Sequence, residues 1–92
     1  PELFNAVIIG VPLFDMLRYH LLLAGASWMG EYGNPEIPEE REWILRYSPY
    51  QALAPNRNYP EPFIFTSTKD DRVHPGHARK AAARLEQLGY PY

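Results

Sequence analysis

The 92 residues are enough for one small domain or for one piece of a larger domain. With 9 basic and 11 acidic side chains, the formal net charge is −2, so the basic excess that binds nucleic acid is missing. Cysteine is absent, which excludes disulfides, thiolate metal ligands and cysteine nucleophiles. No apolar stretch approaches the roughly 20 residues of a membrane helix. We therefore expect no nucleic-acid partner, no membrane span and no signal peptide.

Residues 4–11 form a short apolar run that Pro12 closes. The run predicts a buried strand of the kind found in parallel sheets that are covered on both faces. Residues 15–23 are apolar nearly all round, which predicts a helical turn or two inside a larger body. Proline at position 38, followed by acidic residues, predicts the start of a helix.

That helix is expected to end before Ser48-Pro49 and to pack through Trp43, Ile44 and Tyr47. Residues 51–62 contain three prolines and no periodicity, so we expect a loop there. Residues 63–68 are aromatic and β-branched, which predicts a second strand.

The last predicted element is an amphipathic helix that begins after Pro75 and ends before Gly89. Its apolar positions are Ala78, Ala81, Ala82, Leu85 and Leu88. The order of strand, helices, loop, strand, polar loop and helix is typical of an α/β fold with a mostly parallel sheet and flanking helices. Two strands do not make a stable parallel sheet, and the chain holds 10 prolines, about twice the average usage. We therefore interpret the chain as a fragment of a larger domain.

The polar segment Lys69–His74 follows the second predicted strand, and ligands in open α/β sheets bind beyond the carboxyl ends of strands. The simplest interpretation is a charged surface turn with an Asp–Arg pair. His74 and His77 lie three residues apart near Asp70, but no third ligand is evident, so we expect no metal site.

Several short segments in a fixed order carry a more specific signal. They are Asp15-Met16-Leu17-Arg18-Tyr19-His20, Trp28 with Glu31-Tyr32-Gly33, Tyr47-Ser48-Pro49-Tyr50, Asp70-Asp71-Arg72-Val73 and His77-Ala78-Arg79-Lys80. Together they resemble the prolyl oligopeptidase family of serine peptidases, in the C-terminal part of its α/β-hydrolase catalytic domain. The opening Pro1-Glu2-Leu3-Phe4 is similar to the stretch that shortly follows the nucleophile elbow in that family. The resemblance covers residues 1–92 and implies a partial α/β-hydrolase fold.

The resemblance also implies roles for individual residues. Asp70 matches the triad acid that orients the catalytic histidine and stabilises its imidazolium form. Arg72 matches the arginine that donates hydrogen bonds to a substrate backbone carbonyl. Trp28 matches the ring that stacks on the substrate proline, and Val73, Leu13 and Tyr32 match further walls of that pocket. Val73, Leu13 and Tyr32 could equally be ordinary core residues, and an ordinary core tryptophan is the less favoured alternative for Trp28.

The expected serine precedes the acid and the expected histidine follows it in this family, and neither is found in the 92 residues. The resemblance thus implies a serine peptidase that cleaves short peptides after proline, with no cofactor, whose activity requires the rest of its catalytic domain. A β-propeller domain would restrict access to small substrates. A cytoplasmic location is implied, and a periplasmic one is equally compatible with the absence of cysteine. A sibling peptidase with acylaminoacyl or dibasic preference, an esterase on the same fold and a non-catalytic binding module remain alternatives.

Overall fold

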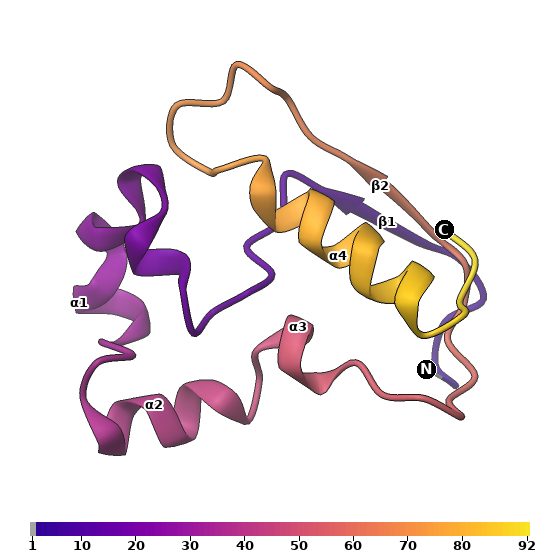
Figure 1. The fold of residues 1–92 in the computed structure, drawn as a ribbon, viewed down its shortest axis with the longest axis horizontal. Helices are drawn as coiled ribbons and strands as arrows, with labels where there is room; N and C mark the ends of the chain where they lie inside the picture. Colours follow the sequence, from indigo (N-terminus) through magenta and orange to yellow (C-terminus); the bar gives the residue numbers. More distant parts are fainter. Residues whose placement is uncertain (1) are drawn as a thin grey trace.

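The computed structural model describes residues 2–92, so Pro1 of the opening segment lies outside the described residues. A small parallel sheet and one long helix lie on one side, and a lobe of short helices lies on the other (Figure 1). In chain order the elements are β1 (Val7–Gly10), the 3-10 helices η1 (Tyr19–Leu21) and η2 (Leu23–Trp28), α1 (Met29–Tyr32), α2 (Pro38–Leu45), α3 (Pro49–Ala52), β2 (Pro62–Phe65) and α4 (Gly76–Gln87). The α/β order expected from the sequence is confirmed.

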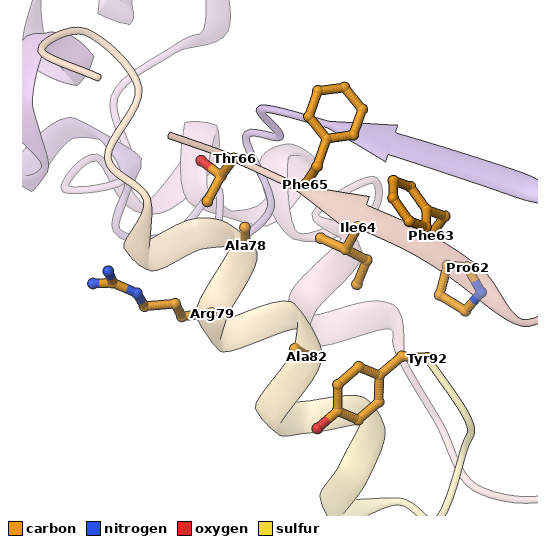
Figure 2. A pocket seen from close by; sticks show the side chains of 9 residues that line it. All are labelled: Pro62, Phe63, Ile64, Phe65, Thr66, Ala78, Arg79, Ala82 and Tyr92. Carbon is orange, nitrogen blue, oxygen red and sulfur yellow. The ribbon is translucent and has the colours of Figure 1, made fainter. Parts of the chain in front are cut away.

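The two strands pair in parallel, with Val7 opposite Pro62 and Gly10 opposite Phe65. The Val11 N–H extends the ladder by donating to the Phe65 carbonyl at 2.9 Å. Alternate side chains point to opposite faces of a strand, so Ile64 is directed toward α4 while Phe63 and Phe65 are directed away from it (Figure 2).

The expectation that both faces of the sheet are covered is wrong for one face of the described structure. Helix α4 lies along one face, whereas Ile8 and Phe63 on the other face are 75% and 66% exposed. The Phe65 ring lies over Gly10 on this open face. A Cβ at Gly10 would come within 2.4 Å of that ring.

Helix α4 follows the predicted amphipathic pattern. Ala78, Ala81 and Leu85 are buried, while Ala82 and Leu88 are half-buried. The helix ends at Gln87, and Gly89 has the left-handed φ of 82° that favours glycine after a helix end. The prediction for this helix is therefore confirmed.

The lobe of short helices encloses an apolar core that keeps residues 13–48 together. Its buried members are Met16, Leu17, Tyr19 and Ile44, and Leu13, Trp28, Met29 and Tyr32 pack against them. The Tyr19 hydroxyl donates to the Gly33 carbonyl at 2.6 Å, so its one polar atom is satisfied. The helical turns predicted for residues 15–23 are present as η1 and the start of η2.

Helix α2 begins at Pro38 as predicted, but its packing face is narrower than expected. Ile44 is fully buried, whereas Trp43 and Tyr47 are 43% and 47% exposed. The helix lies at the edge of the lobe, so the Trp43 ring covers Gly33 from outside and the Tyr47 hydroxyl reaches the Tyr32 carbonyl at 3.4 Å. The prediction that all three residues pack inward was wrong for Trp43 and Tyr47.

The predicted loop over residues 51–62 starts later than expected, because α3 (Pro49–Ala52) extends into it. Pro49 occupies the first helical turn, where a missing N–H costs nothing, and the Ala52 N–H closes that turn on the Ser48 carbonyl at 3.1 Å. Within residues 2–92, no helix is both long enough and apolar enough to cross a bilayer.

Candidate functional site

Asp70 lies in the loop that follows the carboxyl end of β2. Its Oδ1 accepts the backbone N–H groups of Arg72 and Val73, each at 2.9 Å. These hydrogen bonds, from Arg72 first and then from Val73, hold the pKa of the Asp70 carboxyl below its usual value. Oδ2 makes no hydrogen bond with residues 2–92, so the ionised carboxylate keeps one oxygen available. The Asp–Arg ion pair of the simplest interpretation is not formed; Arg72 contributes its backbone N–H instead.

A cleft of about 300 Å³ lies beyond the carboxyl ends of both strands. Leu13 follows β1, Val73 follows β2, and Trp28 and Tyr32 come from the helical lobe between the strands. The structure thus brings together the four residues that the resemblance places around one pocket. The remaining lining residues are Val11 and Glu31.

A backbone hydrogen bond joins the two parts of the chain that flank this cleft, the loop after β2 and the helical lobe. The Arg72 carbonyl accepts the Ala24 N–H at 3.3 Å, which ties the loop after β2 to η2, the helix that ends at Trp28. On the other side, the Val73 N–H binds Asp70. Asp70 and the walls of the cleft are therefore parts of one connected structure, although Asp70 itself does not line the cleft.

Two polar groups beside the cleft have no hydrogen-bond partner among residues 2–92. The Arg72 guanidinium is exposed and makes neither a hydrogen bond nor an ion pair there. The Tyr32 hydroxyl is also unpaired, while the Tyr32 ring packs edge-on against Tyr19 with centroids 5.8 Å apart. Trp28 is half-buried and packs against the core, so it serves as both a structural residue and a cleft wall.

A buried polar cluster anchors the loops that carry the cleft. Asp15 is fully buried and accepts hydrogen bonds from Lys80, from Gln51 at 2.8 Å and from Arg18 at 3.1 Å. Burial acts to raise the pKa of Asp15, but the hydrogen bonds from these three side chains outweigh it and leave the pKa below its usual value. The cluster joins the lobe to α3 and to α4.

His77 and Ser48 complete this cluster. The His77 Nδ1 accepts the backbone N–H groups of Phe14 and Asp15, both at 3.1 Å. The Ser48 hydroxyl oxygen accepts the Met16 N–H at 3.0 Å. Segments that carried the sequence resemblance, far apart in the chain, therefore meet at one place and fix the path of residues 13–16.

The histidines near Asp70 are engaged with the backbone. The His74 Nδ1 accepts the Gly76 N–H at 2.8 Å, and the His77 Nδ1 is used as described above. Within residues 2–92, no group of three or more His, Asp or Glu side chains is arranged to hold a metal ion.

A larger groove, of about 390 Å³, lies between β2 and α4 (Figure 2). Ile64, Ala82 and Tyr92 line part of it, and none of the candidate site residues reaches it. It runs alongside the strand and not beyond its carboxyl end, where ligands of open α/β sheets bind. The smaller cleft beside Asp70 is therefore the better candidate site.

Known proteins resemble the chain in sequence and in fold. Residues 1–92 match the sequence profile of the prolyl oligopeptidase family over their whole length. The chain belongs to the prolyl oligopeptidase family.

Relatives from several organisms align with nearly the whole chain. An uncharacterised peptidase of Sinorhizobium fredii is 52% identical over 92 residues, and the prolyl endopeptidase of Dictyostelium discoideum is 37% identical over 91 residues. The chain covers 13% and 12% of these two proteins, respectively. The activity of the complete proteins is therefore not a property of these 92 residues alone.

Solved structures of the prolyl oligopeptidase family superpose closely on the chain. A post-proline cleaving enzyme from Rickettsia typhi matches with a TM-score of 0.94 at 44% identity, over 99% of this chain and 13% of that one. A second structure, from a study of two prolyl endopeptidases, matches with a TM-score of 0.92 at 44% identity and the same coverage. The partial α/β-hydrolase fold expected from the sequence is confirmed.

Two lining residues, Val11 and Glu31, and the supporting cluster were not predicted from the sequence. Val11 has a φ of 46° immediately after β1, and its position at a strand end was a usable signal. Glu31 stood inside a segment that carried the resemblance, but only its neighbours were given roles. The contacts of Asp15 and His77 span 62 residues, and no local pattern reveals such a pairing.

Proposed function

We propose that these residues form part of the catalytic domain of a serine peptidase that cleaves short peptides after proline. Asp70 is the triad acid in this proposal. The serine nucleophile precedes residues 1–92 in the complete polypeptide, and the catalytic histidine follows them. The substrate partners are proline-containing peptides, and a β-propeller domain limits access to small ones. The proposed compartment is the cytoplasm, which cell fractionation would check against the periplasm.

One observation carries the proposal: an apolar cleft with an aromatic wall lies beside a carboxylate that is held ionised. A proline ring is compact and apolar, and its nitrogen has no N–H that needs a partner, so it suits a cleft walled by Trp28, Leu13 and Val73. The names of the relatives support the same preference, since they include prolyl endopeptidases and a post-proline cleaving enzyme.

The roles of the polar groups follow from what each can donate or accept. Asp70 Oδ2 would accept the Nδ1–H of the catalytic histidine, while Oδ1 is fixed by two backbone N–H groups. That histidine then takes the proton of the serine hydroxyl during attack on the peptide carbonyl and returns it to the leaving amine. The unpaired Arg72 guanidinium would hold a substrate carbonyl, and the free Tyr32 hydroxyl would donate to another.

The test uses the full-length polypeptide that carries these residues. We expect it to react with a fluorophosphonate probe and to cleave an Ala-Pro-Ala peptide on the carboxyl side of proline, as mass spectrometry of the products would show. Absence of probe labelling would leave the non-catalytic alternative. Labelling with cleavage of simple acyl esters but not of prolyl peptides would point to an esterase, and cleavage after other residues to a sibling peptidase.

A further inference from the structure

We propose that Glu31 makes the cleft prefer peptides in which a lysine or arginine lies next to the cleaved proline. This inference rests on the proposed function, because it assumes that the cleft holds the substrate proline. It adds a selection by charge to a site that otherwise selects by shape.

Glu31 is the one charged residue among those that line the cleft within residues 2–92. It belongs to α1 and lies three positions after Trp28, on the same short helix as Tyr32. Four of the other lining residues are the apolar Val11, Leu13, Trp28 and Val73. An exposed carboxylate at the border of an apolar cleft is costly to desolvate without a partner, so a bound ligand must either leave it hydrated or neutralise it.

The carboxylate of Glu31 has no hydrogen bond and no ion pair within residues 2–92. Other acids of the lobe are paired: Glu36 contacts His20 at 2.8 Å, and Glu42 contacts Arg46 at 3.9 Å. The Arg72 guanidinium is likewise unpaired and therefore does not neutralise Glu31. Because no described residue neutralises Glu31, a cationic side chain of the substrate is the partner that fits this carboxylate.

The expected preference is modest, because Glu31 is exposed and water screens the pair. Exposed ion pairs change an equilibrium by about two- to fivefold, and the effect falls as ionic strength rises. We therefore expect kcat/KM at low salt to be about two- to fivefold higher for a lysine-flanked proline than for an alanine-flanked one. A glutamate in the same position should lower kcat/KM by a similar factor, because apolar walls focus the field of the carboxylate.

The experiment measures kcat/KM of the full-length polypeptide on internally quenched peptides with lysine, alanine or glutamate on either side of one proline. Glu31→Gln removes the charge and keeps the shape, and Glu39→Gln removes the same charge from an exposed position on α2 outside the cleft. The lysine-to-alanine ratio should fall to about one in Glu31→Gln and stay unchanged in Glu39→Gln. High salt should reduce the ratio in the unmodified protein.

Three negative outcomes can be told apart. If the alanine-flanked peptide is cleaved after proline but the ratio is the same in the unmodified protein and in Glu31→Gln, the inference is overturned and the proposed function stands. If no peptide is cleaved after proline, the proposed function fails first. Equal loss of the ratio in both variants would assign the effect to overall charge and would also overturn the role of Glu31.

Discussion

His77 and Asp15 are joined by two opposing interactions. The His77 Nδ1 accepts the Asp15 backbone N–H at 3.1 Å, which requires an unprotonated Nδ1, while the Asp15 carboxylate favours a charged imidazole. Burial lowers the pKa of His77, the Asp15 carboxylate raises it, and Lys80 and His74 lower it further, so the pKa ends below its usual value. The His77 ring is therefore neutral in the folded state.

This pairing predicts a pH-dependent stability. The unfolded chain protonates His77 near pH 6.5, whereas the folded chain does so only at lower pH. Between these two pKa values the unfolded state binds more protons, so the free energy of unfolding should fall as the pH drops below about 6.5. Urea unfolding of the full-length polypeptide at pH 7.5 and 5.5 would measure this.

Two variants separate the contribution of His77 from that of other groups. In His77→Asn, the amide oxygen replaces Nδ1 as acceptor, so most of the stability should remain and the pH dependence should shrink. In His77→Leu, two buried backbone N–H groups lose their acceptor, which should cost about 2 kcal/mol or more at pH 7.5. An unchanged pH dependence in His77→Asn would assign the effect to another group.

Substitutions of the two neighbouring acids in the loop after β2 should affect the activity of the enzyme very differently. Asp70→Asn retains an oxygen for the Arg72 and Val73 N–H groups, so the loop should keep its shape while kcat falls about 10⁴-fold. Asp71 is exposed and has no side-chain partner within residues 2–92, so Asp71→Asn should keep kcat within about twofold. Single-turnover and steady-state rates on a proline peptide would show both. The opposite order of effects would assign the triad role to Asp71.

The chain contains two tryptophans that form a matched pair for testing proline selection. Trp28→Ala should lower the preference for proline over alanine at the cleavage position by about tenfold or more, and Trp28→Phe should keep most of it. Trp43 lies on α2 and does not line the cleft, so Trp43→Ala should leave this ratio unchanged. A ratio that survives in Trp28→Ala would favour the sibling peptidase with another preference.

Two glycines near the cleft should respond in opposite ways to alanine. Gly33 has a φ of 98°, and a Cβ there would come within 2.5 Å of the Trp43 ring. With a ψ of 167°, Gly33 lies in a region that only glycine commonly adopts, so Gly33→Ala should destabilise the fold by about 1–3 kcal/mol from the backbone alone, with the clash in addition. Gly30 has open space around it in α1, so Gly30→Ala should be neutral or stabilising by up to about 1 kcal/mol.

Thermal or urea unfolding of both glycine variants would check these values. The double variant Gly33→Ala with Trp43→Ala removes the clash and leaves only the backbone strain. If it is no more stable than the sum of the single changes predicts, the contact with Trp43 contributes nothing.

The elements that the sequence predicted correctly are those with a local signal. The amphipathic spacing of Ala78, Ala81 and Leu85 and the proline at position 38 depend on neighbouring residues only. The inward packing predicted for Trp43 was wrong because it depends on where α2 lies relative to the lobe. The open face of the sheet at Ile8 and Phe63 could not be predicted from an apolar run. Such a run indicates a strand with two apolar faces but does not show which elements pack on each face.

The same distinction applies to the site. The resemblance named four walls of the cleft by position, and the structure brings Leu13, Trp28, Tyr32 and Val73 together. Their roles toward a substrate remain predictions. The Asp15 and His77 contacts that hold this arrangement could not be predicted, since they depend on tertiary packing and not on a local period.

The contacts that complete the cleft join residues far apart in the chain, and this has a consequence for the order of folding. Leu13 and Trp28 leave the ribosome well before Val73, and the His77 acceptor lies 63 residues after the Phe14 N–H that it binds. Contacts of such long range form late, because the entropy of closing a long loop is lost before the contacts are made. The cleft is therefore incomplete until Val73 has been synthesised and His77 of α4 has bound the Phe14 and Asp15 N–H groups. A nascent chain that stops short of residue 77 would lack the acceptor for the Phe14 and Asp15 N–H groups, so the segment that carries Leu13 would not yet be fixed in place.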